Sequence, residues 1–273
     1  MKRFFSVFCL TALFIYLAFA LSIYQKQRAL MYTPILEKLS RSDVGVQNVK
    51  IIHIETEDGL RLEGWYVPPQ KENNKIIVFF HGNGQNIGSS YSGVAQLIKD
   101  GYGLLMVEYR GYAGHKGTFT EQGVYKDCRA FIDWLSQTHQ VKYSDMILYG
   151  ESLGAAVAVQ MASEYDAHAL ILLAPFSSMV DIARARYPYL PVSLLLEDQY
   201  LSDKKIQQIR MPILIMHGNR DRVIDIESGG KLFEAANEPK KFVEFPQGGH
   251  NNLYDFGASQ HVLNFLAGID KKN

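Results

Sequence analysis

Six short apolar runs, rich in β-branched and aromatic residues, alternate with amphipathic segments along most of the chain. The runs cover residues 75–80, 102–109, 146–149, 169–174, 212–217 and 241–245. Such short and nearly continuous hydrophobic runs are typical of strands buried on both faces. Helical periodicity is found in the segments 87–100, 121–138, 153–165, 227–237 and 257–268. We therefore predict an α/β fold with a mostly parallel central sheet and helices on both faces.

Residues 49–69 alternate between apolar and polar side chains around Asp58-Gly59. An Asp-Gly pair between two alternating runs is a strong hairpin signal. We expect the hairpin to add an antiparallel edge to the sheet, so that residues 49–273 form one α/β domain. The chain of 273 residues has the length of one such domain once an N-terminal segment is set aside.

The N-terminal segment contains an uncharged apolar run at residues 4–24. It is long enough to cross a hydrocarbon core of about 30 Å as a helix. A cleaved signal peptide is the alternative, because Ala18-Phe19-Ala20 fits a small-residue cleavage pattern. The length of the run favours a transmembrane anchor at residues 1–24, followed by a linker at residues 25–48. Basic residues flank the run on both sides, so the orientation stays open.

The charge balance and the cysteines exclude several kinds of partner. Lysine plus arginine and aspartate plus glutamate number 28 each, so no net field attracts nucleic acid, and we expect no nucleic-acid partner. Neither Cys9 nor Cys128 has a second cysteine or a histidine at metal-ligand spacing. We predict no metal and no organic cofactor.

A glycine-rich stretch follows the first buried run, at residues 81–88. Gly82 and Gly84 match a dinucleotide-binding loop, but Gly88 lies one position beyond the expected third glycine. The other interpretations are a loop whose backbone N–H groups face a cavity and stabilise negative charge, or a turn without a ligand. Ligands of parallel sheets bind at the carboxyl ends of strands, where this loop is expected.

The run at 146–149 ends in Gly150-Glu151-Ser152-Leu153-Gly154, directly before a predicted helix. A serine on a sharp strand-to-helix turn is exposed at the edge of the sheet, and glycines two residues on either side avoid a steric collision. The helix that starts after Ser152 favours an anion there. This placement makes Ser152 a candidate nucleophile.

A serine nucleophile needs a base and an orienting acid. After such an elbow, the expected chain order is serine, then an acid, then histidine. Asp221 lies shortly after the run at 212–217 and is our choice for the acid, with Asp225 as the alternative. His250 lies in a glycine-bearing loop after the last run and is the candidate base.

The other histidines have different predicted roles. His81 and His217 lie at strand ends and are interpreted as loop-shaping residues, whereas His115 is a candidate for lining the substrate pocket. The remaining ones are interpreted as structural or solvated: His53, His139, His168 and His261.

Together these motifs resemble the α/β-hydrolase superfamily. The resemblance extends to the membrane-anchored serine hydrolases of the BEM46-like group, related to the ABHD17-type and ABHD13-type proteins. The blocks that carry it are "QRALMYTP", "DGLRLEGWYVPP", "FFHGNGQN", "VEYRGYAGHKG", "YGESLGAAVAVQMA", "LLAPFSSMVDIA", "ILIMHGNRDRVI" and "GGHNNL". They cover most of the chain and are more specific for the group than for its substrate.

The resemblance implies a catalytic triad of Ser152, Asp221 and His250, with an oxyanion hole formed by the backbone N–H groups of Asn83 and Leu153. Two stretches depart from the pattern of the group. Relatives often carry a serine and a Pro-Ser pair where this chain has His115, Thr118 and Phe119, so we expect a different pocket there. They also often carry a proline where Asp225 stands.

Residues 180–208 are too long for a simple crossover and mix aromatic, proline and apolar side chains. In the fold that the chain resembles, such an insertion commonly forms a cap over the acyl pocket; packing against the sheet is an equal interpretation. With a membrane anchor, a short cap suits lipid or acylated substrates. Glu151, beside the serine, is a second candidate for lining the pocket.

The sequence therefore favours a membrane-anchored serine hydrolase that acts on ester, thioester or amide bonds, with residues 4–24 in the membrane. A peptidase with the same triad is one alternative. A catalytically silent scaffold of the same fold is the other. The natural substrate and the oligomeric state stay open.

Overall fold

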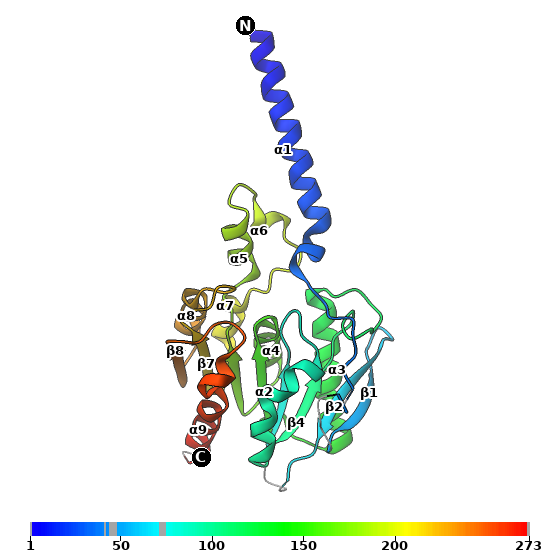
Figure 1. The fold of residues 1–273 in the computed structure, drawn as a ribbon, viewed down its shortest axis with the longest axis vertical. Coiled ribbons are helices and arrows are strands. Elements are labelled where there is room, and N and C mark those ends of the chain that lie inside the picture. Colours follow the sequence, from blue (N-terminus) through cyan, green and yellow to red (C-terminus); the bar gives the residue numbers. More distant parts are fainter. Residues whose placement is uncertain (1, 41, 44–47, 71–74, 272–273) are drawn as a thin grey trace.

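The computed structural model describes residues 2–40, 42–43, 48–70 and 75–271. Its strands form one eight-stranded sheet in the order β1-β2-β4-β3-β5-β6-β7-β8 (Figure 1). They are β1 (Lys50–Glu55), β2 (Arg61–Val67), β3 (Ile76–Phe80), β4 (Gly103–Val107), β5 (Met146–Glu151), β6 (Ala169–Leu173), β7 (Ile213–Gly218) and β8 (Lys240–Phe245). The β1–β2 and β2–β4 pairs are antiparallel, and the other pairs are parallel. The predicted α/β fold, with its antiparallel N-terminal edge, is confirmed.

Helices cover both faces of the sheet because side chains along each buried strand point alternately to opposite faces. Ile76, Val78 and Phe80 of β3 belong to a core shared with α3 and α4, whereas Ile77 and Phe79 belong to a core shared with α2 and α9. The helices of the body are α2 (Ile87–Lys99), α3 (Glu121–His139), α4 (Leu153–Glu164), α8 (Ile226–Ala235) and α9 (Ala258–Asp270).

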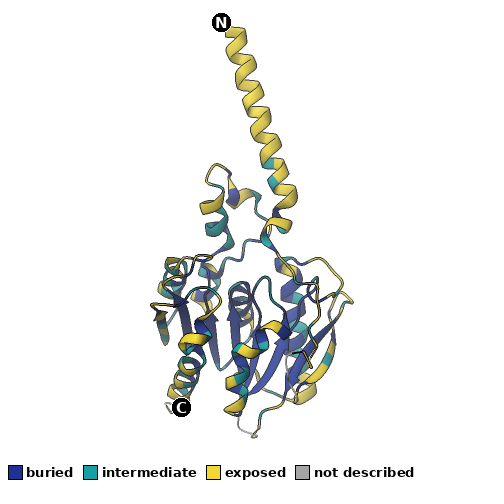
Figure 2. Ribbon diagram, viewed as in Figure 1, coloured by how far each residue is buried: buried dark blue, intermediate teal, exposed yellow. Residues whose placement is uncertain are grey.

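The first helix, α1 (Lys2–Met31), projects from the body as a long rod (Figure 1). Most of its residues are exposed (Figure 2). Within the described part of the chain, it is the one helix long and apolar enough to cross a membrane, by length and composition. It continues to Met31 instead of ending near Tyr24, because Gln, Lys, Arg, Ala, Leu and Met in residues 25–31 are good helix formers. Residues 41 and 44–47 of the predicted linker lie outside the described residues.

The insertion between β6 and β7 folds into the short segments α5 (Met179–Arg186), α6 (Val192–Leu195), α7 (Ser202–Lys205) and η2 (Ile206–Gln208). The first two stand above the sheet, beside the base of α1 (Figure 1). Val180, Leu190 and Val192 form a small apolar cluster of their own, to which Ala20 and Ile23 of α1 add. We call residues 179–201 the cap.

Candidate active site

Ser152 occupies the sharp turn between β5 and α4. Its backbone has φ +53° and ψ −113°, a conformation that is strained for a residue with a side chain. The Ser152 amide donates to the carbonyl of Leu173 on the neighbouring strand at 2.9 Å, which holds the turn against the sheet. The sheet therefore holds Ser152 in this strained conformation, and the Ser152 side chain lies at the carboxyl edge of the sheet.

The glycines around Ser152 are required by close backbone packing. A Cβ on Gly150 would collide with the carbonyl oxygen of Gly154, and a Cβ on Gly154 would collide with the carbonyl oxygen of Phe80 on β3. Both obstacles are main-chain atoms of the packed core, so neither can move away cheaply. This is the physical basis of the glycine spacing.

His250 joins Ser152 to Asp221. Its Nε2 lies 3.0 Å from the Oγ of Ser152, and its Nδ1 lies 2.7 Å from the Oδ2 of Asp221. Because a carboxylate only accepts hydrogen bonds, Nδ1 carries the proton and Nε2 is left to accept from the serine hydroxyl. The three residues come from three separate loops at the carboxyl edge of the sheet, as the sequence predicts.

The carboxylate of Asp221 is buried and has several donors. Burial alone would raise the pKa of Asp221, but hydrogen bonds from His217, His250 and the Ile224 amide lower it below its ordinary value. The Ile224 amide donates to Oδ1 at 2.9 Å, and the Nε2 of His217 lies 3.2 Å from Oδ2. Asp221 is thus held as an anion facing the imidazole of His250.

Asn83 lies in the loop after β3, next to the elbow. Gly82 packs directly on the elbow, since a Cβ there would be 3.4 Å from the Cβ of Ser152. The side chain of Asn83 accepts from the Thr33 amide at 2.9 Å and from the Tyr112 hydroxyl at 2.8 Å, and donates to the Met31 carbonyl at 2.8 Å. Among the described residues, no acceptor is seen for the backbone amides of Asn83 and Leu153.

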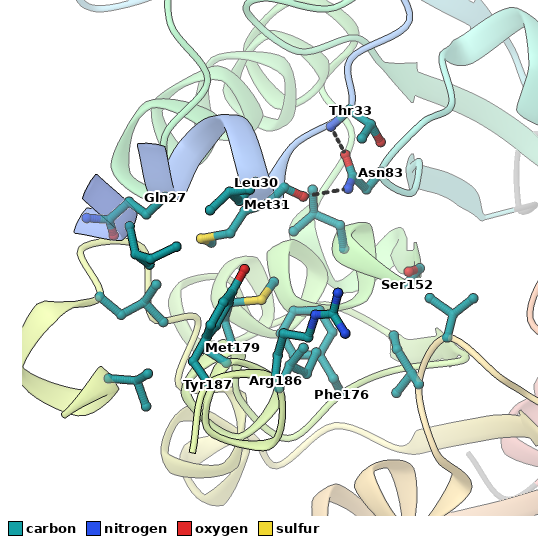
Figure 3. A pocket seen from close by; sticks show the side chains of 18 of the residues that line it. Gln27, Leu30, Met31, Thr33, Asn83, Ser152, Phe176, Met179, Arg186 and Tyr187 are labelled. Atoms are coloured by element: carbon teal, nitrogen blue, oxygen red, sulfur yellow. Dashed lines mark hydrogen bonds between the residues drawn. The ribbon is translucent and has the colours of Figure 1, made fainter. Parts of the chain in front are cut away.

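A cavity of about 580 Å³ opens at Ser152. Ser152, Leu153, Asn83 and His250 line it. Most of the other lining residues are apolar and come from α1 and the cap, among them Leu30, Met31 and Met179 (Figure 3). Its volume is in the range of small-molecule sites. Arg186 is the one Asp, Glu, Lys or Arg side chain among the described residues that line it.

Two candidate residues, Asp225 and His115, lie away from the cavity that opens at Ser152. Asp225 is exposed at the start of α8, and His250 pairs with Asp221 instead. His115 lines a separate small cavity with Lys38 and Glu63, because its loop folds against the segment that follows α1. It does not line the cavity that opens at Ser152.

Glu151 is also outside the cavity that opens at Ser152. Its side chain is buried behind the elbow and accepts a hydrogen bond from Gln85 at 3.2 Å. Burial raises the pKa of the Glu151 carboxyl. The contact with Gln85 matters because Gln85 also accepts from the Gly82 amide at 2.8 Å and so ties the elbow to the Asn83 loop.

The wall contributed by α1 was not predicted. Ile23, Gln27, Leu30 and Met31 line the cavity although they precede Ser152 by more than a hundred positions. The only sign of this wall in the sequence is that apolar residues such as Leu30 and Met31 follow the predicted anchor, and they do not indicate which residues they face. Within the described residues, no group of three or more His, Cys, Asp or Glu side chains is placed to hold a metal ion.

Comparisons with known proteins support the α/β-hydrolase superfamily. The Hydrolase_4 family model, described as serine aminopeptidase, S33, matches residues 71–192. An uncharacterized protein of Mycobacterium tuberculosis is 34% identical over 231 residues, which are 84% of this chain and 82% of that protein. The α/β-hydrolase domain-containing protein WAV2 of Arabidopsis thaliana is 29% identical over 270 residues, covering 90% of this chain and 88% of that one.

Among solved structures, the Pyrococcus furiosus esterase Pf2001 superposes with a TM-score of 0.69 at 21% identity. The match covers 86% of this chain and 98% of the esterase. At this identity, the likeness concerns the fold alone.

Proposed function

Because the chain belongs to the α/β-hydrolase superfamily, we propose that it is a membrane-anchored serine hydrolase that cleaves acyl esters or thioesters at Ser152. The observation that carries the proposal is the continuous contact from Ser152 through His250 to Asp221, at 3.0 Å and 2.7 Å. A serine, a histidine and a buried carboxylate in this order are the minimal machinery for covalent acyl transfer.

In the proposed reaction, the Nε2 of His250 removes the hydroxyl proton of Ser152 while Oγ forms a bond to the acyl carbon. The oxyanion is stabilised by the backbone N–H groups of Asn83 and Leu153. His250 then gives its proton to the leaving alcohol or thiol as the bond to it breaks. Water, deprotonated by His250, then attacks the acyl carbon. The bond from the acyl carbon to Oγ breaks, His250 returns the proton to Oγ, and the carboxylic acid leaves. Asp221 fixes the tautomer of His250 and stabilises the imidazolium throughout.

The lining of the cavity supports an acyl substrate. Apolar side chains such as Phe176, Met179 and Leu196 form most of the wall beyond Ser152. An aminopeptidase needs an acidic group to pair with the free amino terminus of its substrate, and no Asp or Glu is among the described residues that line the cavity. We therefore place amide hydrolysis second, although the matching family model carries a peptidase description.

We also propose that α1 anchors the protein in a membrane and that the protein belongs to the BEM46-like group. The apolar part of α1 at residues 4–24 is proposed as the anchor, ahead of the catalytic domain at residues 49–273, and the blocks quoted above support a place in the BEM46-like group. A helix with a long, exposed and uncharged apolar surface is stable in a hydrocarbon core and unfavourable in water.

The test is labelling of the full-length chain in detergent with a fluorophosphonate probe, together with turnover of a short-chain aryl ester and of an aminoacyl anilide. We expect labelling at Ser152 that Ser152→Ala and His250→Ala abolish, and faster turnover of the ester than of the anilide. A residual rate about 10³ to 10⁴ above water is compatible with the triad, because the oxyanion hole and binding remain in these variants. A folded wild type that is neither labelled nor active would favour the silent scaffold.

A further inference from the structure

The cap is hydrogen-bonded to α1 at two heights, and one of these bonds lies well inside the apolar run at residues 4–24. The hydroxyl of Tyr24 donates to Glu197 at 2.8 Å, and the hydroxyl of Tyr16 donates to the carbonyl of Tyr189 at 2.9 Å. Tyr16 precedes Tyr24 by eight positions, or about 12 Å along a helix. Tyr189 therefore lies beside the apolar run, well before the point at which the run ends.

Charged side chains begin at the same height along the α1 axis in α1 and in the cap. Residues 187–196, which we call the cap tip, carry no charged side chain and are bracketed by Arg186 and Glu197. On α1, charge resumes at Lys26 and Arg28, and Arg28 pairs with Glu197 at 2.6 Å and with Asp198 at 3.0 Å. One boundary thus separates an apolar zone of both segments from a charged zone of both.

The cap tip also has the properties that a lipid environment requires. Its large side chains Tyr189 and Leu194 are 86% and 83% exposed. Pro188 and Pro191 have no backbone N–H. The other paired amides of the tip donate to carbonyls inside it: Leu190 to Tyr187, Val192 to Leu190, Leu194 and Leu195 to Pro191, and Leu196 to Val192. Backbone groups paired within the segment are the main condition for placing a chain among acyl tails.

The cavity at Ser152 extends into the space between the cap tip and α1. Ile23 and Leu30 line it from α1, and Leu190, Val192 and Leu195 line it from the tip (Figure 3 shows Leu30, Met31 and the cap side chains around it). Ile23 is one residue before the end of the apolar run. The upper part of the cavity is therefore at the level where the acyl tails begin when α1 spans a bilayer.

We propose that the cap tip inserts into the leaflet beside α1 and that the cavity takes up the acyl chain of a membrane lipid ester directly from that leaflet. This inference rests on the proposed function and adds the source of the substrate and its route. Arg186 stands at the charge boundary, lines the cavity and makes no ion pair with a described residue. A lipid with an anionic or neutral head group fits this position better than a cationic one.

The experiment compares two substrates with full-length protein reconstituted in phosphatidylcholine vesicles. One is a water-soluble short-chain aryl ester, and the other is a long-chain fluorogenic ester lipid in the same vesicles. Leu194→Asp puts a charge on the cap tip outside the cavity lining, and Leu36→Asp is the matched control at a leucine that is 67% exposed and outside the tip. We expect Leu194→Asp to lower the ratio of lipid-ester to short-ester turnover by at least about tenfold, because a carboxylate is unfavourable among acyl tails. We expect Leu36→Asp to leave the ratio unchanged.

A direct readout of insertion uses Leu194→Trp and Leu36→Trp in vesicles with brominated acyl chains. Quenching of the new tryptophan at 194 but not at 36 is expected. An unchanged ratio in Leu194→Asp, or no quenching at 194, would overturn the inference. Turnover of an S-acylated peptide without turnover of the lipid ester would overturn the lipid source. Wild type that cleaves neither ester would instead contradict the proposed function itself.

Discussion

The side-chain amide of Asn83 donates to the main-chain carbonyl of Met31, at the end of α1, at 2.8 Å. The same side chain accepts from the Thr33 amide, so the loop that carries a proposed oxyanion donor is bound to the chain leaving α1 at two points (Figure 3). A proposed oxyanion donor is therefore positioned by the segment that follows the proposed membrane anchor.

Asn83→Ala is expected to lower kcat for a short-chain aryl ester by about tenfold or more. The substitution removes the side-chain hydrogen bonds that hold the loop, and with it the backbone N–H of residue 83 that faces the oxyanion. Thr33→Ala is the control: the Thr33 amide makes the bond to Asn83, and alanine keeps that amide. Undiminished kcat in Asn83→Ala would show that the loop is held by other contacts.

Asp221→Asn is expected to lower kcat by about 10⁴, because the amide no longer enforces the Nδ1–H tautomer of His250. It also removes a pH-dependent contribution to stability. The pKa of Asp221 in the folded chain is below its ordinary value of 3.8, so this contribution is present above that pH and is lost as the pH falls further. Urea denaturation should show a gap between wild type and variant at pH 7 that narrows below about pH 4. A gap that widens on acidification would contradict this assignment.

Glu151→Gln should have the opposite pH dependence. Burial raises the pKa of Glu151 above its ordinary value of 4.5, so the folded state is penalised as the pH rises through that range and the carboxyl ionises. The glutamine keeps a donor and an acceptor near Gln85 but has no charge to bury. We expect the variant to gain free energy of unfolding relative to wild type at pH 7 to 8, with the difference disappearing near pH 4. Equal stability of the two proteins at every pH would mean that Glu151 is well solvated.

Gly154→Ala is expected to destabilise the fold by about 2 kcal/mol or more, because the added methyl overlaps the Phe80 carbonyl in a packed core. Labelling of Ser152 should fall as well, since the elbow must shift to relieve the overlap. The matched control is Gly230→Ala on α8, where an added Cβ meets nothing within 4 Å. There the substitution should stabilise by about 0.5 to 1 kcal/mol through the helix preference of alanine. Thermal unfolding of both variants distinguishes a steric effect from a general effect of removing glycine.

The parts of the structure that local sequence determines could be predicted well. The six apolar runs became β3 to β8 within a few residues, because period and length separate strands from helices; β8, at the edge of the sheet, is only partly buried. The approach of Ser152, Asp221 and His250 could also be expected, since the ends of parallel strands meet at one edge. Their catalytic roles are still predictions.

The parts that depend on distant packing could not be predicted. His115 was expected at the pocket, but its loop turns toward Lys38 and Glu63, and nothing in the loop itself indicates this neighbour. Glu151 is adjacent to Ser152 in sequence, yet it ends β5 with a buried side chain, whereas Ser152 lies on the sharp turn that follows. Leu30 of α1 lines the same cavity as residues more than 120 positions away, which the order of the residues does not reveal.

The part of α1 that lines the cavity begins after the site at which a protease could release the protein from its anchor. The first α1 residue that lines the cavity is Ile23, three positions after Ala20, the last residue of the small-residue cleavage pattern. A protease that cut there would detach the outer part of the rod, including Tyr16, and leave every cavity-lining residue of α1 on the shed body. Such a cut would thus remove the α1 residues beside the cap tip while every residue that lines the cavity at Ser152 stays in the released protein.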